Sequence, residues 1–163
     1  MLLRWPQSFG CHHMRGKTLT QPIELRDVLP TLLDAAGANI PAHLDGMSLL
    51  KLIREDAKNW RPFIDLEHDV CYSEENHWNA LTDGRFKYIY HAYDGHEQLF
   101  DLKNDPGEIY DLAADPAYSK TLKTWRNRLV EHLTERGEAF VSNGRLVQRP
   151  KRLLYSPLFP ERR

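Results

Sequence analysis

The stretch that decides the fold is Leu81–Leu112, which reads LTDGRFKYIYHAYDGHEQLFDLKNDPGEIYDL. Two of its segments, Arg85–His91 and Glu97–Leu102, alternate apolar and polar residues and are rich in the aromatic and branched residues that suit a pleated, half-buried surface. Asp-Gly dipeptides at 83–84 and 94–95 tolerate the positive φ of tight hairpin turns. The middle of the chain is therefore predicted to be an antiparallel meander.

Working outward from the meander, earlier segments add strands to it. Pro62–Leu66, Val70–Ser73 and Trp78–Thr82 are short candidates, and together with the meander they predict a sheet of about four strands. Alternation also divides the central strand into two faces. Its charged residues are expected on the wet side of the sheet, opposite its aromatic residues: Arg85, Lys87 and His91 against Phe86, Tyr88 and Tyr90.

Three helices are predicted around this sheet. The first begins at Asp27, has Pro30 in its first turn and ends at Gly37. A short helix follows at Ser48–Arg54, and a long one runs from Pro116 to Arg136. Helical spacing predicts one buried stripe for each helix. In the first helix the stripe is Val28, Leu29, Leu32, Leu33 and Ala36, and in the short helix it is Leu49, Leu50, Leu52 and Ile53. In the long helix it is Tyr118, Leu122, Trp125, Leu129 and Leu133.

Composition excludes several classes of partner. The chain has 163 residues and a formal net charge of −1, which gives no reason to expect nucleic acid or an anionic membrane. It has no apolar run of the roughly 20 residues that a membrane span needs, and MLLRWPQSF does not resemble a signal peptide. The only two cysteines, Cys11 and Cys71, do not form a disulfide framework, which favours the cytoplasm.

Four motifs in this order resemble the C-terminal part of a sulfatase of the alkaline-phosphatase-like superfamily. Pro22–Gly37 resembles P-V-x-L-x-D-x-x-P-T-L-L-x-x-A-G, and Asp45–Leu49 resembles D-G-x-S-L. Thr82–Tyr88 resembles T-D-G-x-x-K-Y, and Leu99–Leu112 resembles L-F-D-L-x-x-D-P-x-E-x-x-[ND]-L. The resemblance extends over residues 2–136.

The resemblance implies an α+β fold in three parts. Residues 1–58 would be the closing elements of a sulfatase α/β core, with residues 2–5 as the end of a strand. Residues 59–140 would be a small four-stranded antiparallel sheet packed on a long C-terminal helix, and residues 141–163 an irregular tail.

The resemblance also implies a chemistry, the hydrolysis of sulfate esters. In the family a cysteine within C-x-[PA]-x-R becomes formylglycine, whose hydrate attacks sulfur beside a calcium or magnesium ion held by oxygen ligands. Those parts precede the segment that matches here, because Leu3-Arg4-Trp5-Pro6 resembles the strand that follows the last sulfate-binding lysine. The chain alone is therefore expected to be inactive, with neither the formylglycine nor the cation site.

Two local clusters are weaker candidates for this chemistry. Cys11 and Arg15 have the spacing of the formylglycine motif, but His13 replaces its Pro or Ala and no Asp pair lies nearby. Cys11 is therefore rejected as the nucleophile. His12, His13 and His43 are read as parts of solvated loops, and no metal site is predicted.

Glu67 and His68 are the predicted substrate-binding residues. The resemblance implies that Glu67-His68-Asp69 faces the mouth of the active site, where His68 would donate to a substrate oxygen while Glu67 or Asp69 holds its tautomer. An ordinary polar turn is an equal alternative. The polar residues that follow are read as a solvated edge of the sheet: Glu74, Glu75, Asn76 and His77.

Two functional hypotheses follow. The first is a sulfatase C-terminal region, or that of a related phosphoryl or phosphonate ester hydrolase, which binds a sulfate-ester substrate as part of a whole enzyme. The second is a free-standing interaction module. Under either hypothesis, this chain lacks the sheet that Val28, Leu32 and Leu33 meet in the family. The apolar surface that is then exposed is expected to drive self-association.

Overall fold

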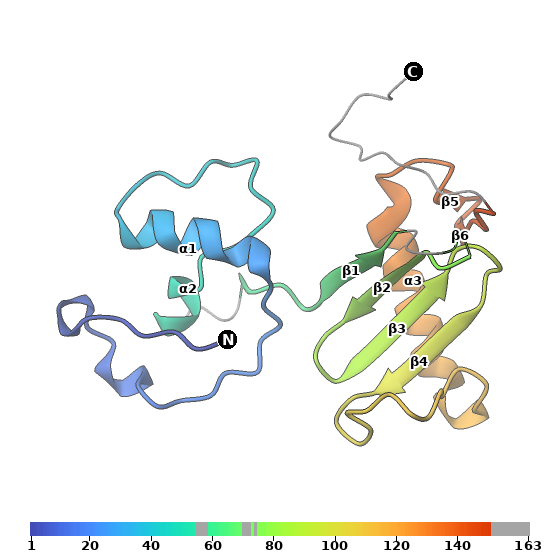
Figure 1. The fold of residues 1–163 in the computed structure, drawn as a ribbon, viewed down its shortest axis with the longest axis horizontal. Helices are drawn as coiled ribbons and strands as arrows, with labels where there is room; N and C mark the ends of the chain where they lie inside the picture. Colours follow the sequence, from blue (N-terminus) through green and yellow to red (C-terminus); the bar gives the residue numbers. More distant parts are fainter. Residues whose placement is uncertain (55–58, 70–72, 74, 151–163) are drawn as a thin grey trace. The chain divides into compact units, whose positions relative to one another are not determined.

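The computed structural model describes residues 1–54, 59–69, 73 and 75–150 (Figure 1). The chain divides into two compact units, Met1–Pro62 and Phe63–Arg163. The division falls four residues after the expected boundary at 58, because Trp60 and Arg61 are held by the first unit. Trp60 Nε1 donates to the Pro22 carbonyl at 2.8 Å, and Arg61 Nη1 donates to Glu24 Oε1 at 2.6 Å.

The first unit consists of short helical segments: η1 (Gln7–Phe9), η2 (His12–Met14), η3 (Leu25–Asp27), α1 (Val28–Ala35) and α2 (Leu50–Ile53). As predicted, the side chains of the second short helix are buried, with Leu49, Leu50, Leu52 and Ile53 all 4–5% exposed. Residues 2–5, expected to end a strand, belong to no strand in the part of the chain that the structure describes.

The predicted buried stripe of α1 is wrong. Leu29 is 52% and Leu32 61% exposed, whereas Pro30 and Thr31 are buried. The reason is that residues 47–49 dock on the polar face of the helix by hydrogen bonds: Thr31 Oγ1 accepts from Leu49 N at 2.8 Å. The described residues of this unit leave the opposite, apolar face uncovered, and Leu29 and Leu32 remain exposed there.

The second unit contains the predicted antiparallel sheet. Its strands are β1 (Ile64–His68), β2 (Trp78–Thr82), β3 (Phe86–His91) and β4 (Glu97–Asp101), in the order β1-β2-β3-β4 (Figure 1). Each neighbouring pair is antiparallel, with Trp78 opposite both His68 and His91. Of the further strand candidate at 70–73, residues 70–72 lie outside the described residues.

One face of the sheet packs on α3 (Ser119–Thr134), which follows η5 (Pro116–Tyr118). Asp115 Oδ1 accepts from Ala117 N at 2.8 Å and so caps the start of η5. The core between sheet and helix consists of Leu81, Tyr88, Tyr90, Ala92, Leu99, Trp125, Leu129, Leu133 and Phe140. The helix therefore uses the predicted stripe.

The other face of the sheet is more apolar than expected. Ala80, Ile89 and Phe100 form a second buried cluster there, against which Leu66, Trp78 and Leu102 pack. Lys87 lies on this face, but its Nζ donates to Glu108 Oε2 at 2.7 Å. The expectation of a wet face is therefore wrong at its centre, because Phe100 lies opposite Lys87 and Ala80 lies opposite Ile89.

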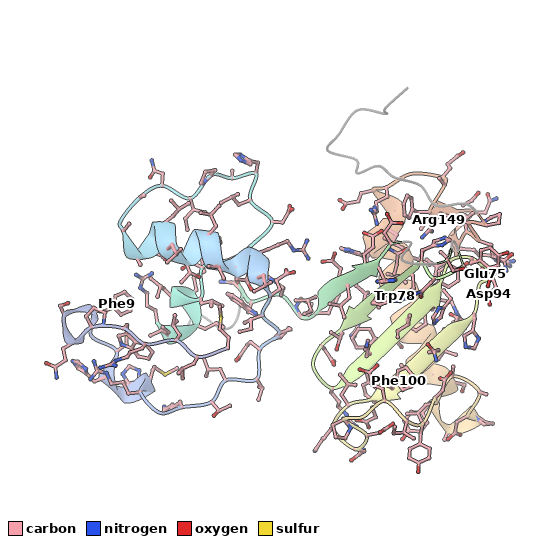
Figure 2. The ribbon with its side chains drawn as sticks, viewed as in Figure 1. Phe9, Glu75, Trp78, Asp94, Phe100 and Arg149 are labelled. Atoms are coloured by element: carbon pink, nitrogen blue, oxygen red, sulfur yellow. The ribbon has the colours of Figure 1, made fainter. Side chains whose placement is uncertain are left out.

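Residues 141–150 are ordered, although an irregular tail was expected from residue 141. β5 (Val141–Ser142) and β6 (Arg145–Leu146) form a hairpin. Beyond it, Arg149 N donates to Ala92 O at 2.5 Å and Gln148 Nε2 to Asp94 O at 2.6 Å. Figure 2 shows Arg149 and Asp94 at the same end of the unit. Residues 151–163 lie outside the described part of the chain. Among the helices that are described, none is long and apolar enough to cross a membrane.

Candidate functional site

Glu67 and His68 are adjacent on β1 and point to opposite faces of the sheet, because side chains alternate along a strand. Glu67 lies on the α3 side, where Arg136 Nη1 donates to its Oε1 at 2.9 Å and its Oε2 at 3.0 Å. Arg136 also lies over the Phe140 ring, 4.4 Å from its centroid. Glu67 therefore joins the first strand to the end of the helix.

His68 lies on the face away from α3, where its ring stacks on Trp78 with centroids 5.6 Å apart and planes 20° apart. Of the two residues expected to hold the tautomer of His68, Glu67 is directed to Arg136 instead, and the role of Asp69 stays a prediction. The structure thus places both predicted substrate-binding residues at the end of β1 but does not bring them together. Their role toward a substrate stays a prediction.

The polar residues before β2 divide into two groups. Glu75 and Asn76 are exposed, as a solvated edge requires, whereas His77 is only 5% exposed. The His77 carbonyl accepts from Ala92 N at 3.0 Å, which ties the entry of β2 to the end of β3. Glu74 lies outside the described residues.

The structure adds Trp78, which had no expected site role, and His91, which the sequence placed on a basic strand face that could attract an anion but was interpreted as the wet side of the sheet. Trp78 and His91 lie on the same face as His68, and His91 Nε2 lies 2.8 Å from Gln98 Oε1. His96 lies in the β3–β4 turn, and the centroid of its ring is 5.5 Å from the centroid of the His91 ring. Strand alternation was the signal that could have found Trp78 and His91, since their register follows from the meander.

A partly buried ionic network lies on the helix side of the sheet. Arg126 donates to both oxygens of Glu97 at 2.6 Å, and Tyr88 Oη donates to Glu97 Oε1. Burial would raise the pKa of Glu97, but these hydrogen bonds outweigh it and hold that pKa below its usual range. Burial, aided by the Glu97 carboxylate, raises the pKa of Tyr88. The network fixes α3 on the sheet.

The described residues do not fit the cation that the family uses. No three His, Cys, Asp or Glu side chains among them lie together as a metal site requires. Cys11 has a left-handed backbone, with φ of 52° and ψ of 38°, and its half-buried side chain packs on the cluster of Met14, Leu50 and Ile53. No chemical step is therefore derived through a cation in this chain.

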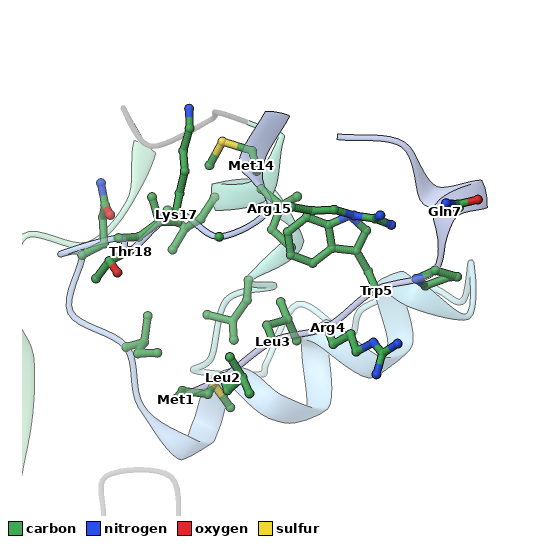
Figure 3. A pocket seen from close by; sticks show the side chains of 18 residues that line it. Met1, Leu2, Leu3, Arg4, Trp5, Gln7, Met14, Arg15, Lys17 and Thr18 are labelled. Atoms are coloured by element: carbon green, nitrogen blue, oxygen red, sulfur yellow. The ribbon is translucent and has the colours of Figure 1, made fainter. Parts of the chain in front are cut away.

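The first unit contains a cavity of about 1140 Å³ near its N-terminal segment. Figure 3 shows Trp5, Met14 and Arg15 among the side chains around it. The lining is apolar except for a few amide, hydroxyl and cationic groups, and it contains no acidic residue, histidine or cysteine. Such a lining has neither the cysteine nor the carboxylates that the chemistry of the family uses.

Comparison with known proteins identifies the family. The domain described as "N-sulphoglucosamine sulphohydrolase, C-terminal" matches residues 1–135. An arylsulfatase of Clostridium perfringens is 34% identical over 134 residues, which cover 82% of this chain and 27% of the relative. A Delta 4,5-hexuronate-2-O-sulfatase of Bacteroides thetaiotaomicron is 39% identical over 118 residues, 71% of this chain and 24% of the relative.

Solved structures agree with these relatives. A 2-O GAG sulfatase superposes with a TM-score of 0.62 at 34% identity, covering 70% of this chain and 25% of that one. A phosphonate monoester hydrolase from Silicibacter pomeroyi superposes with a TM-score of 0.56 at 28% identity, covering 66% of this chain and 24% of that one. The chain spans about a quarter of the length of the relatives that it matches. With its motifs, sheet and long helix in the family's order, the chain belongs to the C-terminal sulfatase family.

Proposed function

We propose that this chain is the C-terminal region of a sulfuric ester hydrolase and that it does not turn over substrate by itself. The observation that carries the proposal is the family match over residues 1–135, combined with a span of about a quarter of each relative. Two observations support it: no three His, Cys, Asp or Glu side chains lie together among the described residues, and the sequence around Cys11 has His13 in place of the Pro or Ala of the formylglycine motif. The chain would then complete the fold and the substrate rim of a larger enzyme.

The surface of the first unit supports this role. Leu25, Leu29 and Leu32 are 86%, 52% and 61% exposed and recur at helical spacing. An exposed apolar patch of this kind indicates a surface that contacts another part of a protein. The occupant that we propose is the catalytic part of a sulfatase polypeptide, which would cover this face of α1.

The proposed substrate is a sulfated saccharide, and His68 is the proposed contact to it. The similar proteins include a hexuronate 2-O-sulfatase and an ulvan-active sulfatase, which supports this substrate class. Glu67 would act indirectly, because its bond to Arg136 holds the end of β1 in place. Calcium or magnesium and the formylglycine would come from the catalytic part.

An assay of sulfate release tests the proposal. The purified chain, incubated with an aryl sulfate and calcium, is expected to give no turnover. Activity that is lost in Cys11→Ala would show that this cysteine is a nucleophile after all. As a second test, DNA upstream of Met1 is expected to encode, in some frame, a C-x-[PA]-x-R segment and an Asp-rich motif; unrelated upstream DNA would favour an interaction module.

A phosphonate ester hydrolase is the second candidate for the whole enzyme. The likeness to a phosphonate monoester hydrolase favours it, because the same C-terminal architecture occurs there. The two candidates are distinguished by assaying the chain together with the upstream polypeptide on an aryl sulfate and on a phosphonate monoester. Preference for the sulfate ester supports the first candidate, and preference for the phosphonate supports the second.

A further inference from the structure

Three ring side chains lie in register across β1, β2 and β3, on the face of the sheet away from α3. Trp78 is opposite His68 on one side and His91 on the other. We call these three residues the ring row. Trp78 is half-buried, packs on the cluster of Ala80, Ile89 and Phe100, and carries the stacked His68 ring. The row is thus held in place by the sheet below it.

Polar groups continue the ring row at one side. His91 Nε2 is 2.8 Å from Gln98 Oε1. The next ring is that of His96, which is 56% exposed and whose Nε2 lies 4.0 Å from Asp111 Oδ2. Flat apolar ring faces and imidazole or amide edges therefore alternate along this end of the sheet.

The sheet segregates its charged and titratable residues between its faces. Every acidic residue of the four strands lies on the α3 side: Asp65, Glu67, Glu97 and Asp101. The basic residues of the strands, which are His68, Lys87 and His91, all lie on the other face. An anion that approaches the ring row therefore meets imidazole donors on the strands and no strand carboxylate.

We propose that the ring row is a saccharide subsite that binds one sugar ring of a sulfated saccharide. A pyranose has an apolar C–H face and a polar rim, and side chains that combine a flat apolar body with a polar edge match both. The stacked rings of Trp78 and His68 receive the sugar face, the His68 imidazole donates to a hydroxyl or sulfate oxygen, and His91, whose Nε2 is bonded to Gln98 Oε1, accepts from a sugar hydroxyl at its other ring nitrogen. The inference rests on the proposed function, since it extends the substrate contact of His68 to Trp78 and His91.

Binding to the chain itself tests the subsite. The ¹⁵N-labelled chain is titrated with a 2-O-sulfated heparin disaccharide and with its unsulfated counterpart, and amide and indole N–H shifts are followed. We expect saturable shifts at Trp78, His68 and His91, with the sulfated sugar binding more tightly. Trp78→Ala is expected to weaken binding by about tenfold or more. Tyr110→Ala is the matched control, because Tyr110 is an aromatic residue 70% exposed in another loop.

Two further variants keep the test decisive. Trp78→Phe retains a ring if Trp78→Ala does not fold, and His91→Phe, which removes a polar ring edge from the row, is expected to weaken the binding of both sugars. The proposal is overturned by shifts that fail to saturate at millimolar sugar, by shifts that map elsewhere, or by wild-type affinity in both Trp78 variants. It is also overturned if the row mediates only protein contact, seen as self-association that Trp78→Phe removes.

The sugar-binding experiment and the test of the proposed function can fail separately. Saccharide binding at the ring row with upstream DNA unrelated to sulfatases would leave the subsite standing and remove the hydrolase. Conversely, a sulfatase sequence upstream with no sugar shifts at the row would retain the hydrolase and overturn the subsite.

Discussion

Asp27 Oδ1 accepts a hydrogen bond from the backbone N–H of Met47 at 2.8 Å, across twenty residues of sequence. The carboxylate is fully buried, and it also accepts from Glu24 N at 2.9 Å and from the guanidinium of Arg61. It therefore holds three segments of the first unit together. This geometry explains why the motif around Asp27 and the motif Asp45–Leu49 occur together: one supplies the acceptor and the other the donor.

Replacing Asp27 with alanine is expected to destabilise the first unit strongly. The change leaves the guanidinium of Arg61, which is 14% exposed, with only Glu24 as a partner and removes the acceptor for Met47. Losing one member of a buried ion pair costs about 3 kcal/mol or more. Urea unfolding followed by Trp60 fluorescence, together with hydrogen exchange at Met47, measures the effect. Arg54→Ala, which breaks an exposed pair with Asp34, should cost less than about 1 kcal/mol.

Gly46 tolerates no side chain, because a Cβ there would lie 1.9 Å from the carbonyl oxygen of Arg26. Gly46→Ala should therefore separate the loop from the start of α1 and abolish the exchange protection of Met47. Gly37→Ala is the control in the same unit: a Cβ there meets nothing within 4 Å, and only its φ of 68° opposes the change. That strain is worth about 1 kcal/mol. Equal unfolding midpoints for the two variants would contradict the steric account.

The second unit is expected to lose stability in acid through Glu97. The pKa of Glu97 is lower in the folded chain than its value of about 4.3 in an unfolded one. Its contribution is therefore fully present above the unfolded pKa and is lost as the pH falls through the folded pKa. In Glu97→Gln, the free energy of unfolding should depend less on pH below about pH 5. Glu131→Gln, at an exposed site on α3, should retain the wild-type slope.

The sequence predicted the sheet well, because two Asp-Gly turns fix the register of β3 against its neighbours. It failed at α1, since helical spacing marks an apolar stripe at Leu29 and Leu32 without saying whether anything covers it. Gln148 and Arg149 were missed because isolated contacts hold them and leave no periodic pattern: Gln148 bonds Asp94, and Arg149 bonds Ala92 and Asn79. For the site, position along the chain suggested that Glu67 and His68 act as a pair, whereas strand alternation separates them.

The exposed face of α1 should make the isolated chain self-associate. Leu29 and Leu32 offer apolar area that is worth about 25 cal/mol per Å² when removed from water, and a second copy is the nearest available cover. Sedimentation velocity over a concentration series should show association that Leu29→Glu combined with Leu32→Glu reduces. The control is Ile109→Glu combined with Tyr110→Glu, which changes an equally exposed apolar pair on a loop of the second unit. Association that survives the α1 variant but not the loop variant would place the contact on the loop. The exposed face of α1 would then no longer support the proposed docking of a catalytic part.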